Sequence, residues 1–168
     1  MAELDARATA VAWVRAVMDE RDLRAAWPLT EPDLRLVLAQ HWILSHGGDE
    51  VVGSPEGWDT LAAGLAACPP THLGWEVFAA ERLKRWRQYW AGFNSTTWDL
   101  RDEPEIPRPG MEIVTFIQPG QKLRTKPGPP IVYRRLAVRR ADEPDATWRL
   151  AGLEGTSLFR PGWPPTPA

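Results

Sequence analysis

The sequence predicts an α+β fold in which N-terminal helices pack on a C-terminal antiparallel sheet. Apolar residues recur every three or four positions through the first half of the chain, which is the spacing of amphipathic helices. The second half carries short β-branched segments separated by turn residues, which is typical of strands. Because 168 residues with 43% hydrophobic and 25% charged residues can bury one core, a single domain spanning 1–168 is expected.

Two long helices are expected at the start of the chain. The first spans residues 4–21, and a short helical segment follows it over 22–27. The second begins at Thr30-Glu31-Pro32-Asp33, where the Thr30 hydroxyl is expected to cap the helix and the proline to occupy its first turn. Gly47-Gly48 ends this second helix.

Two further helices follow, and the second of them is the most aromatic segment of the chain. The shorter one opens at Ser54-Pro55-Glu56 and closes at Cys68-Pro69-Pro70. Thr71 is expected to cap the aromatic helix, which ends near residues 92–95. Its apolar residues have heptad-like spacing: Trp75, Phe78, Ala79, Leu83, Trp86, Trp90 and Phe93. This stripe must be covered by another part of the protein.

The strands of the second half have recognisable patterns. Residues 111–117 are apolar at both alternations, which indicates a strand buried on both faces. The segments at 131–140 and 147–153 have the pattern of antiparallel strands, each with one face that is more exposed to solvent. The remaining expected segments are a short strand at 96–101, a proline-rich connection at 104–110 and a polar turn at 140–145.

Two segments fit neither pattern. The loop at 118–130 is long, basic and rich in proline and glycine, and such a loop either carries function or is simply mobile. The proline-rich C-terminal arm at 160–168 is neither helix nor central strand. With Trp163 among its prolines, the arm either docks in an extended form or is disordered.

Composition excludes several classes of function. The formal charge of -2 disfavours electrostatic capture of nucleic acid or an anionic membrane. A single cysteine, Cys68, permits no intrachain disulfide and no cysteine-based zinc cluster, and no other metal-ligand spacing occurs. The chain has neither a signal-peptide pattern nor an apolar run long enough for a membrane span, so a cytoplasmic location is expected.

The order of helices and strands resembles the NTF2-like, or SnoaL-like, superfamily with its cone-shaped fold. The resemblance rests on the helical first half and on the terminal hairpin formed by 133–138 and 147–153. In addition, Trp27-Pro28-Leu29-Thr30 and Gly162-Trp163-Pro164-Pro165-Thr166 resemble an uncharacterised group of actinobacterial proteins. The superfamily implies a curved sheet that wraps a long helix and leaves a pocket. Its members include isomerases, cyclases and dehydratases, and also proteins that only bind or dimerise.

Three residues are candidates for acid/base catalysis, and each has a structural alternative. His41 lies on the apolar stripe of the second helix, where it is either a general base or a core histidine. Asp22 caps the segment beginning at Leu23 or enters a pocket. Asp99, beside Trp98, pairs with an arginine or becomes a general base through a raised pKa.

The ten tryptophans of the chain favour an aromatic cavity or an aromatic core. The residues expected to contact a ligand are Trp42, Trp75, Trp86, Trp90, Tyr133 and Arg135. Arg135 and Arg149 face each other across the expected terminal hairpin, where they grip a carboxylate if they point inward and are solvated if they point outward.

Three hypotheses of function follow. The first is a non-catalytic domain that binds a small apolar molecule in a Trp-lined cavity or forms a homodimer. The second is an isomerase-, cyclase- or dehydratase-like enzyme that acts on an apolar, carbonyl-bearing substrate. The third is a protein-interaction subunit that binds through exposed tryptophans and the C-terminal arm. No cofactor is expected, because no phosphate-binding loop and no metal motif occur.

Overall fold

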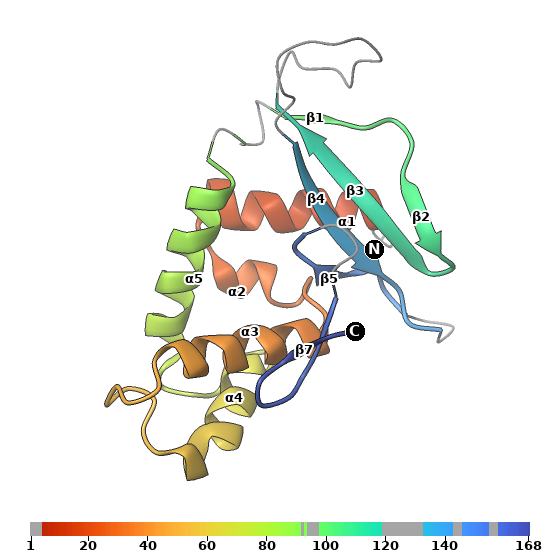
Figure 1. Cartoon of the computed structure of the whole chain (residues 1–168). Coiled ribbons are helices and arrows are strands. Elements are labelled where there is room, and N and C mark those ends of the chain that lie inside the picture. Colours follow the sequence, from red (N-terminus) through yellow and green to blue (C-terminus); the bar gives the residue numbers. More distant parts are fainter. Residues whose placement is uncertain (1–4, 92, 94–97, 119–132, 143–145, 155–157) are drawn as a thin grey trace.

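Helices precede strands throughout the chain, and the α+β class is confirmed (Figure 1). The computed structural model describes residues 5–91, 93, 98–118, 133–142, 146–154 and 158–168. The helical elements are α1 (Ala6–Arg15) with a π-helical turn (Ala16–Glu20), α2 (Leu23–Ala26), α3 (Pro32–Ser45), a 3-10 turn (Pro55–Gly57), α4 (Trp58–Ala66) and α5 (Trp75–Tyr89).

Side-chain caps explain where α2 starts, and they correct the expected start of α3. The Asp22 carboxylate accepts hydrogen bonds from the backbone of Arg24 at 2.8 Å and of Ala25 at 3.3 Å, so Asp22 caps α2. Thr30 was expected to cap α3, but its hydroxyl accepts from Trp13 Nε1 at 3.0 Å and donates to the Ala26 carbonyl at 2.9 Å. The helix begins one residue later, at Pro32.

The aromatic helix α5 is shorter than the sequence predicts. Thr71 does not cap it, because the helix begins at Trp75 with Gly74 in the capping position. It ends at Tyr89, so Trp90 lies just beyond its last residue. The expected end near residues 92–95 is therefore about one turn too late, although Trp90 is buried all the same.

Within the described residues, five strands form one antiparallel sheet in which β1 and β2 share an edge of β3, followed by β4 and then β5. Strand β3 is buried on both faces at every position except Glu112, which confirms the expected pattern. The expected proline-rich connection contains a short strand, β2, and Pro107 is tolerated there because β2 is an edge strand. The strands are β1 (Asp99–Leu100), β2 (Glu105–Arg108), β3 (Met111–Ile117), β4 (Tyr133–Arg139) and β5 (Arg149–Gly152).

The two faces of the sheet bury different groups. Helix α1 lies against β3, β4 and β5, and behind β3 and β4 in Figure 1. Apolar residues of alternate positions join the helical core on this side: Val114, Phe116, Leu136, Val138 and Leu150. A smaller cluster lies separately: Met111, Ile113, Ala137, Ala151 and Leu158. The main core is thus a helix layer packed on one sheet face.

The C-terminal segment folds back onto α3 and α4, where β6 (Phe159–Arg160) pairs with β7 (Thr166–Pro167) (Figure 1). The Trp163 indole donates to Asp59 at 2.7 Å and its ring lies 5.5 Å from that of Trp58. The Gly162 amide donates to the Gln40 side chain at 3.0 Å. Of the two outcomes expected for this arm, docking is the one observed.

Parts of several expected segments lie outside the described residues. These parts are the first residue of the helix at 4–21, the loop at 118–130 apart from Gln118, the ends of the two strands at 96–97 and 131–132, and positions 143–145 of the turn.

Candidate functional site

A short extended segment brings the start of α3 against the edge of the sheet. The Glu31 amide donates to the Leu150 carbonyl at 2.8 Å, and the Leu150 amide donates to the Leu29 carbonyl at 2.7 Å. These bonds occupy the free edge of β5, as a parallel bridge between Thr30 and Leu150. Because Pro32 starts the helix immediately afterwards, α3 runs beside the edge strand.

Three adjoining clefts lie along α3, and we call them together the α3 groove. The central cleft, of about 550 Å³, lies between α3, β2 and the C-terminal segment. A cleft of about 300 Å³ shares Leu34, Ala151 and Phe159 with it and extends to His41. A third cleft of about 400 Å³ shares Glu31, Asp33 and Arg139 with the central one. The groove is therefore continuous from one end of α3 towards the other.

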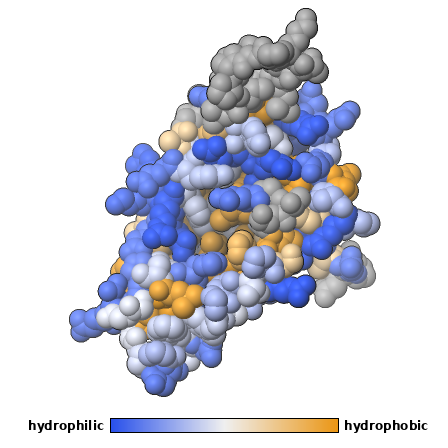
Figure 2. All heavy atoms as spheres, viewed as in Figure 1, coloured by the Kyte–Doolittle hydropathy of each residue, from blue (hydrophilic) through white to orange (hydrophobic). Residues whose placement is uncertain are grey.

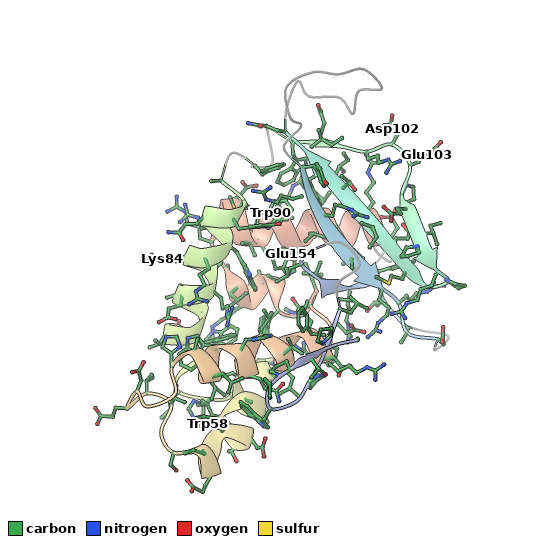
Figure 3. All side chains as sticks on the ribbon, in the orientation of Figure 1. Trp58, Lys84, Trp90, Asp102, Glu103 and Glu154 are labelled. Atoms are coloured by element: carbon green, nitrogen blue, oxygen red, sulfur yellow. The ribbon has the colours of Figure 1, made fainter. Side chains whose placement is uncertain are left out.

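The end of the groove near His41 is mainly apolar. Its apolar side chains are Leu34, Val37, Leu38, Ala151, Leu153 and Phe159. Only His41 and Glu154 add ionisable groups, and Glu154 follows β5 in the chain (Figure 3). Figure 2 shows apolar surface in the middle of this face, between α3 and the sheet, with hydrophilic surface to either side.

His41 lies at the rim of the groove and not in the core, which corrects its expected place on the buried stripe of α3. Its residue is exposed, whereas Val37 and Trp42 on the same helix are buried. The imidazole ring packs edge-on against Phe159 at 5.7 Å. Partial burial, and secondarily the charge of Arg82, lower the pKa of His41 below its usual 6.5. The neutral imidazole is therefore favoured at neutral pH.

The other end of the groove is charged. Arg139 Nη2 lies 2.5 Å and Arg139 Nε 2.7 Å from the same oxygen of Glu31. The positive charge of Arg139 and the negative charge of Glu31 therefore compensate each other. Arg108 and Arg160 line the same cleft, and neither guanidinium group has a hydrogen bond or ion pair within the described part of the chain. Asp33 is the other acid of this cleft.

The four tryptophans expected to contact a ligand lie in the core. Each is at most 7% exposed. They pack on other rings at centroid distances of 5.0–5.7 Å: Trp86 on Trp13, Trp75 on Trp27, Trp42 on Phe78 and Trp90 on Phe116. Neither the three clefts of the α3 groove nor the cleft beside α5 includes a tryptophan among its described lining residues. The structure does not bring these tryptophans to the groove.

The other expected site residues are also apart from the groove. Asp99 is exposed at the start of β1, opposite Ile117. Tyr133 faces Ile117 from β4 and is 48% exposed. Arg135 forms an ion pair with Glu105 at 2.5 Å on the outer face of the sheet. Asp22, the remaining candidate, is the cap of α2.

Arg139, and not Arg135, is the arginine that lies opposite Arg149. The register of β4 and β5 places Val138 opposite Leu150 and Arg139 opposite Arg149, and sequence alternation alone does not fix which residues of two strands are paired. Arg139 shares a strand face with Arg135, so the alternation of β4 is a signal that could have indicated it. For Arg108 and Arg160 the sequence holds no comparable signal, because they come from distant segments.

No cluster of three or more His, Cys, Asp or Glu residues suited to a metal ion occurs in the described ranges. No described helix combines the length and apolar character needed to cross a membrane. No protein-family model, curated protein or solved structure matches the chain.

Proposed function

We propose that this chain is a non-catalytic domain that binds a small, largely apolar molecule in the α3 groove. The observation that carries the proposal is the continuity of an apolar cleft with a charged one along a single helix. Ligand sites are concave, mostly apolar and lined by a few polar groups that orient the ligand, and the cleft that extends to His41 has this character. The proposal thus moves the expected ligand site from the tryptophans to the groove.

The walls of the groove are held in place by contacts outside it. The Glu31 amide ties the start of α3 to β5, and the Gly162 and Trp163 hydrogen bonds hold the C-terminal segment on α3 and α4. A preformed site avoids the cost of ordering its walls when a ligand enters. The NTF2-like resemblance is retained within this proposal, supported by the order of helices and antiparallel strands.

The first experiment is native mass spectrometry of freshly purified protein. A reproducible added mass on each 18.9 kDa chain supports a bound ligand. A homodimer without added mass supports instead the hypothesis that the domain forms a homodimer and binds no ligand. A monomer without added mass that also fails to bind octan-1-ol contradicts the proposal.

A groove-filling variant locates the bound molecule. Ala151 lines both the central and the apolar cleft, so Ala151→Leu is expected to abolish binding of octan-1-ol. Ala63→Leu is the matched control, because Ala63 is exposed on α4 and lines none of the three clefts. Circular dichroism confirms that both variants fold. Unchanged binding by a folded Ala151→Leu variant contradicts a site in the groove.

The position of His41 supports a second candidate function, general acid/base catalysis on a carbonyl-bearing ligand. The neutral imidazole accepts a proton, and Glu154 lines the same cleft. The ligand identified by mass spectrometry provides the test. Its conversion by the wild-type protein, and not by a folded His41→Gln variant that still binds it, supports catalysis. Binding without conversion excludes it for that ligand.

A further inference from the structure

We propose that the cleft beside α5 binds an acidic amphipathic helix of another protein. This cleft, of about 470 Å³, lies between the second half of α5 and Arg21, which follows the π-helical turn. It shares no described lining residue with the α3 groove. The two sites are therefore independent, and a partner bound here does not compete with a ligand of the α3 groove.

The charges that line this cleft are all positive. Arg21, Lys84 and Arg87 line it, and no acid does so among the described residues. None of these three side chains has a hydrogen bond or ion pair within the described part of the chain. Figure 3 shows Lys84 on the side of α5 that faces away from the sheet. Because the whole chain has a formal charge of -2, this local excess selects an acidic partner.

The acids in the neighbouring elements do not cancel this positive charge. Both acids of α5 lie beside other partners: Glu76 pairs with Arg24 at 2.6 Å, and Glu81 lies 3.1 Å from His46 Nε2. The acids at 19–20 belong to the π-helical turn and line no part of the cleft. The cations of the cleft therefore remain available to carboxylates from outside the chain.

The backbone at Arg21 favours glycine over arginine. Its φ of 57° lies in the left-handed region, where the Cβ atom crowds the backbone. Among the described residues, Arg21 is the only one other than glycine with a positive φ. An arginine at this position lowers local stability relative to glycine, yet it places a guanidinium group at the cleft. Such a conflict between backbone and side chain is typical of positions that serve binding.

The floor of the cleft suits a helix. Ala80, Leu83 and Ala91 supply its apolar groups. Ala80, Leu83 and Arg87 follow one another at steps of three and four residues, so they lie on one face of α5. Small alanine side chains allow a second helix to pack closely against this face. Ala80 and Gln88 are eight residues apart, which is about 12 Å along the axis, or about two turns of a partner helix.

The test is a fluorescence anisotropy titration at low ionic strength with a labelled peptide of about 14 residues. Leucines form one helical face of this peptide, and glutamates flank that face. It is expected to bind at least about tenfold more tightly than the same peptide with lysine in place of each glutamate. A scrambled peptide of equal composition is expected to bind more weakly, because its leucines form no single face. High salt is expected to weaken binding of the acidic peptide.

Variants of the three cations locate the bound peptide. Lys84→Gln and Arg87→Gln are each expected to weaken binding about threefold, which is the contribution of an exposed ion pair. Arg21→Gly is expected to weaken binding about threefold while it preserves or raises the Tm, because glycine relieves the backbone. The triple variant is expected to lose at least about tenfold. Arg7→Gln is the matched control, since Arg7 is an exposed arginine of α1 outside the cleft.

Each other outcome overturns the proposal. Failure of the acidic peptide to bind contradicts it, and so does binding that the triple variant retains. Displacement of the peptide by an equal concentration of inorganic phosphate assigns the cations to a small anion. A homodimer that dissociates in the triple variant assigns this face of α5 to a second copy of the chain. None of these results bears on the α3 groove, which octan-1-ol tests separately.

Discussion

Arg82 provides a sharp test of the energetics of the core. Its side chain lies on α5 and its residue is only 8% exposed. Nη2 donates to the Leu38 carbonyl at 3.0 Å and the guanidinium lies 5.7 Å from the Phe78 ring centre. Nε is buried without a partner, and no carboxylate within the described residues pairs with this group. We expect the Arg82→Met variant to be more stable than the wild-type protein.

The expected size of the effect follows from the pKa. Burial, with a smaller contribution from the charge of Arg85, lowers the pKa of Arg82 from its usual value to about 10, so the side chain is still protonated at neutral pH. At about 1.4 kcal/mol per pKa unit, burying this charge costs about 3 kcal/mol. Methionine removes that cost but loses a hydrogen bond of about 1 kcal/mol and a cation–π contact of about 0.5 kcal/mol. The net stabilisation is about 1–2 kcal/mol.

Urea denaturation at pH 7 measures this difference directly. The folded pKa of Arg82 is below its unfolded value, so the unfolded state binds more protons in the range above about pH 10. The penalty is complete below about pH 10 and is lost as the pH rises through this range, so the advantage of Arg82→Met should narrow there. Lys84→Met is the control, because Lys84 is exposed on the same helix and should change stability by less than about 0.5 kcal/mol. If Arg82→Met instead lowers stability by more than about 1 kcal/mol, the reasoning is refuted.

Two further predictions concern Thr30 and His41. Thr30→Val keeps the shape of the side chain but leaves the buried Trp13 indole without its acceptor, so urea denaturation should show a loss of about 1–3 kcal/mol, and Thr30→Ser should retain most of the stability. Equal stability of the valine variant would show that the hydrogen bond contributes nothing. The pKa of His41 is lowered in the folded state, so the unfolded chain binds more protons and stability should fall as the pH drops through about 6.5. An NMR titration should place the midpoint of His41 below 6.5, and a midpoint above that value would contradict the burial and Arg82 charge assigned to this site.

The α3 groove depends on contacts between segments that are far apart in the chain. Glu31 and Arg139 are 108 positions apart, and Gly162 and Gln40 are 122 apart. Glu31 makes two of these contacts. Its backbone amide donates to Leu150 at the edge of β5, and its carboxylate pairs with Arg139. A substitution of Glu31 therefore removes the carboxylate at the charged end of the groove, whereas any residue except proline keeps the amide bond to the sheet edge.

Local features of the fold were predictable from sequence because nearby residues determine them. The Asp22 cap of α2, the proline at the start of α3 and the doubly buried strand β3 all depend on residues within a few positions of one another. The spacing of apolar residues also distinguishes the helices from the strands, and this spacing predicts the α+β class.

Residues of the candidate site were less predictable, because a periodic pattern identifies a face but not its neighbour. His41 has the spacing of a core residue, yet the C-terminal segment and β5 leave it at the rim of a cleft. The large number of tryptophans suggests an aromatic binding cavity, yet these side chains fill the core by packing on one another.

The sequence by itself determined the order of helices and strands, several of their ends and the balance of charge, because these depend on local chemistry and composition. The tertiary structure alone decided which side chains meet at the groove. Arg108, Arg139 and Arg160 come together there because strand register, edge pairing and the docking of the C-terminal segment place three distant parts of the chain side by side. Such non-local packing has no counterpart in the spacing of residues along the chain.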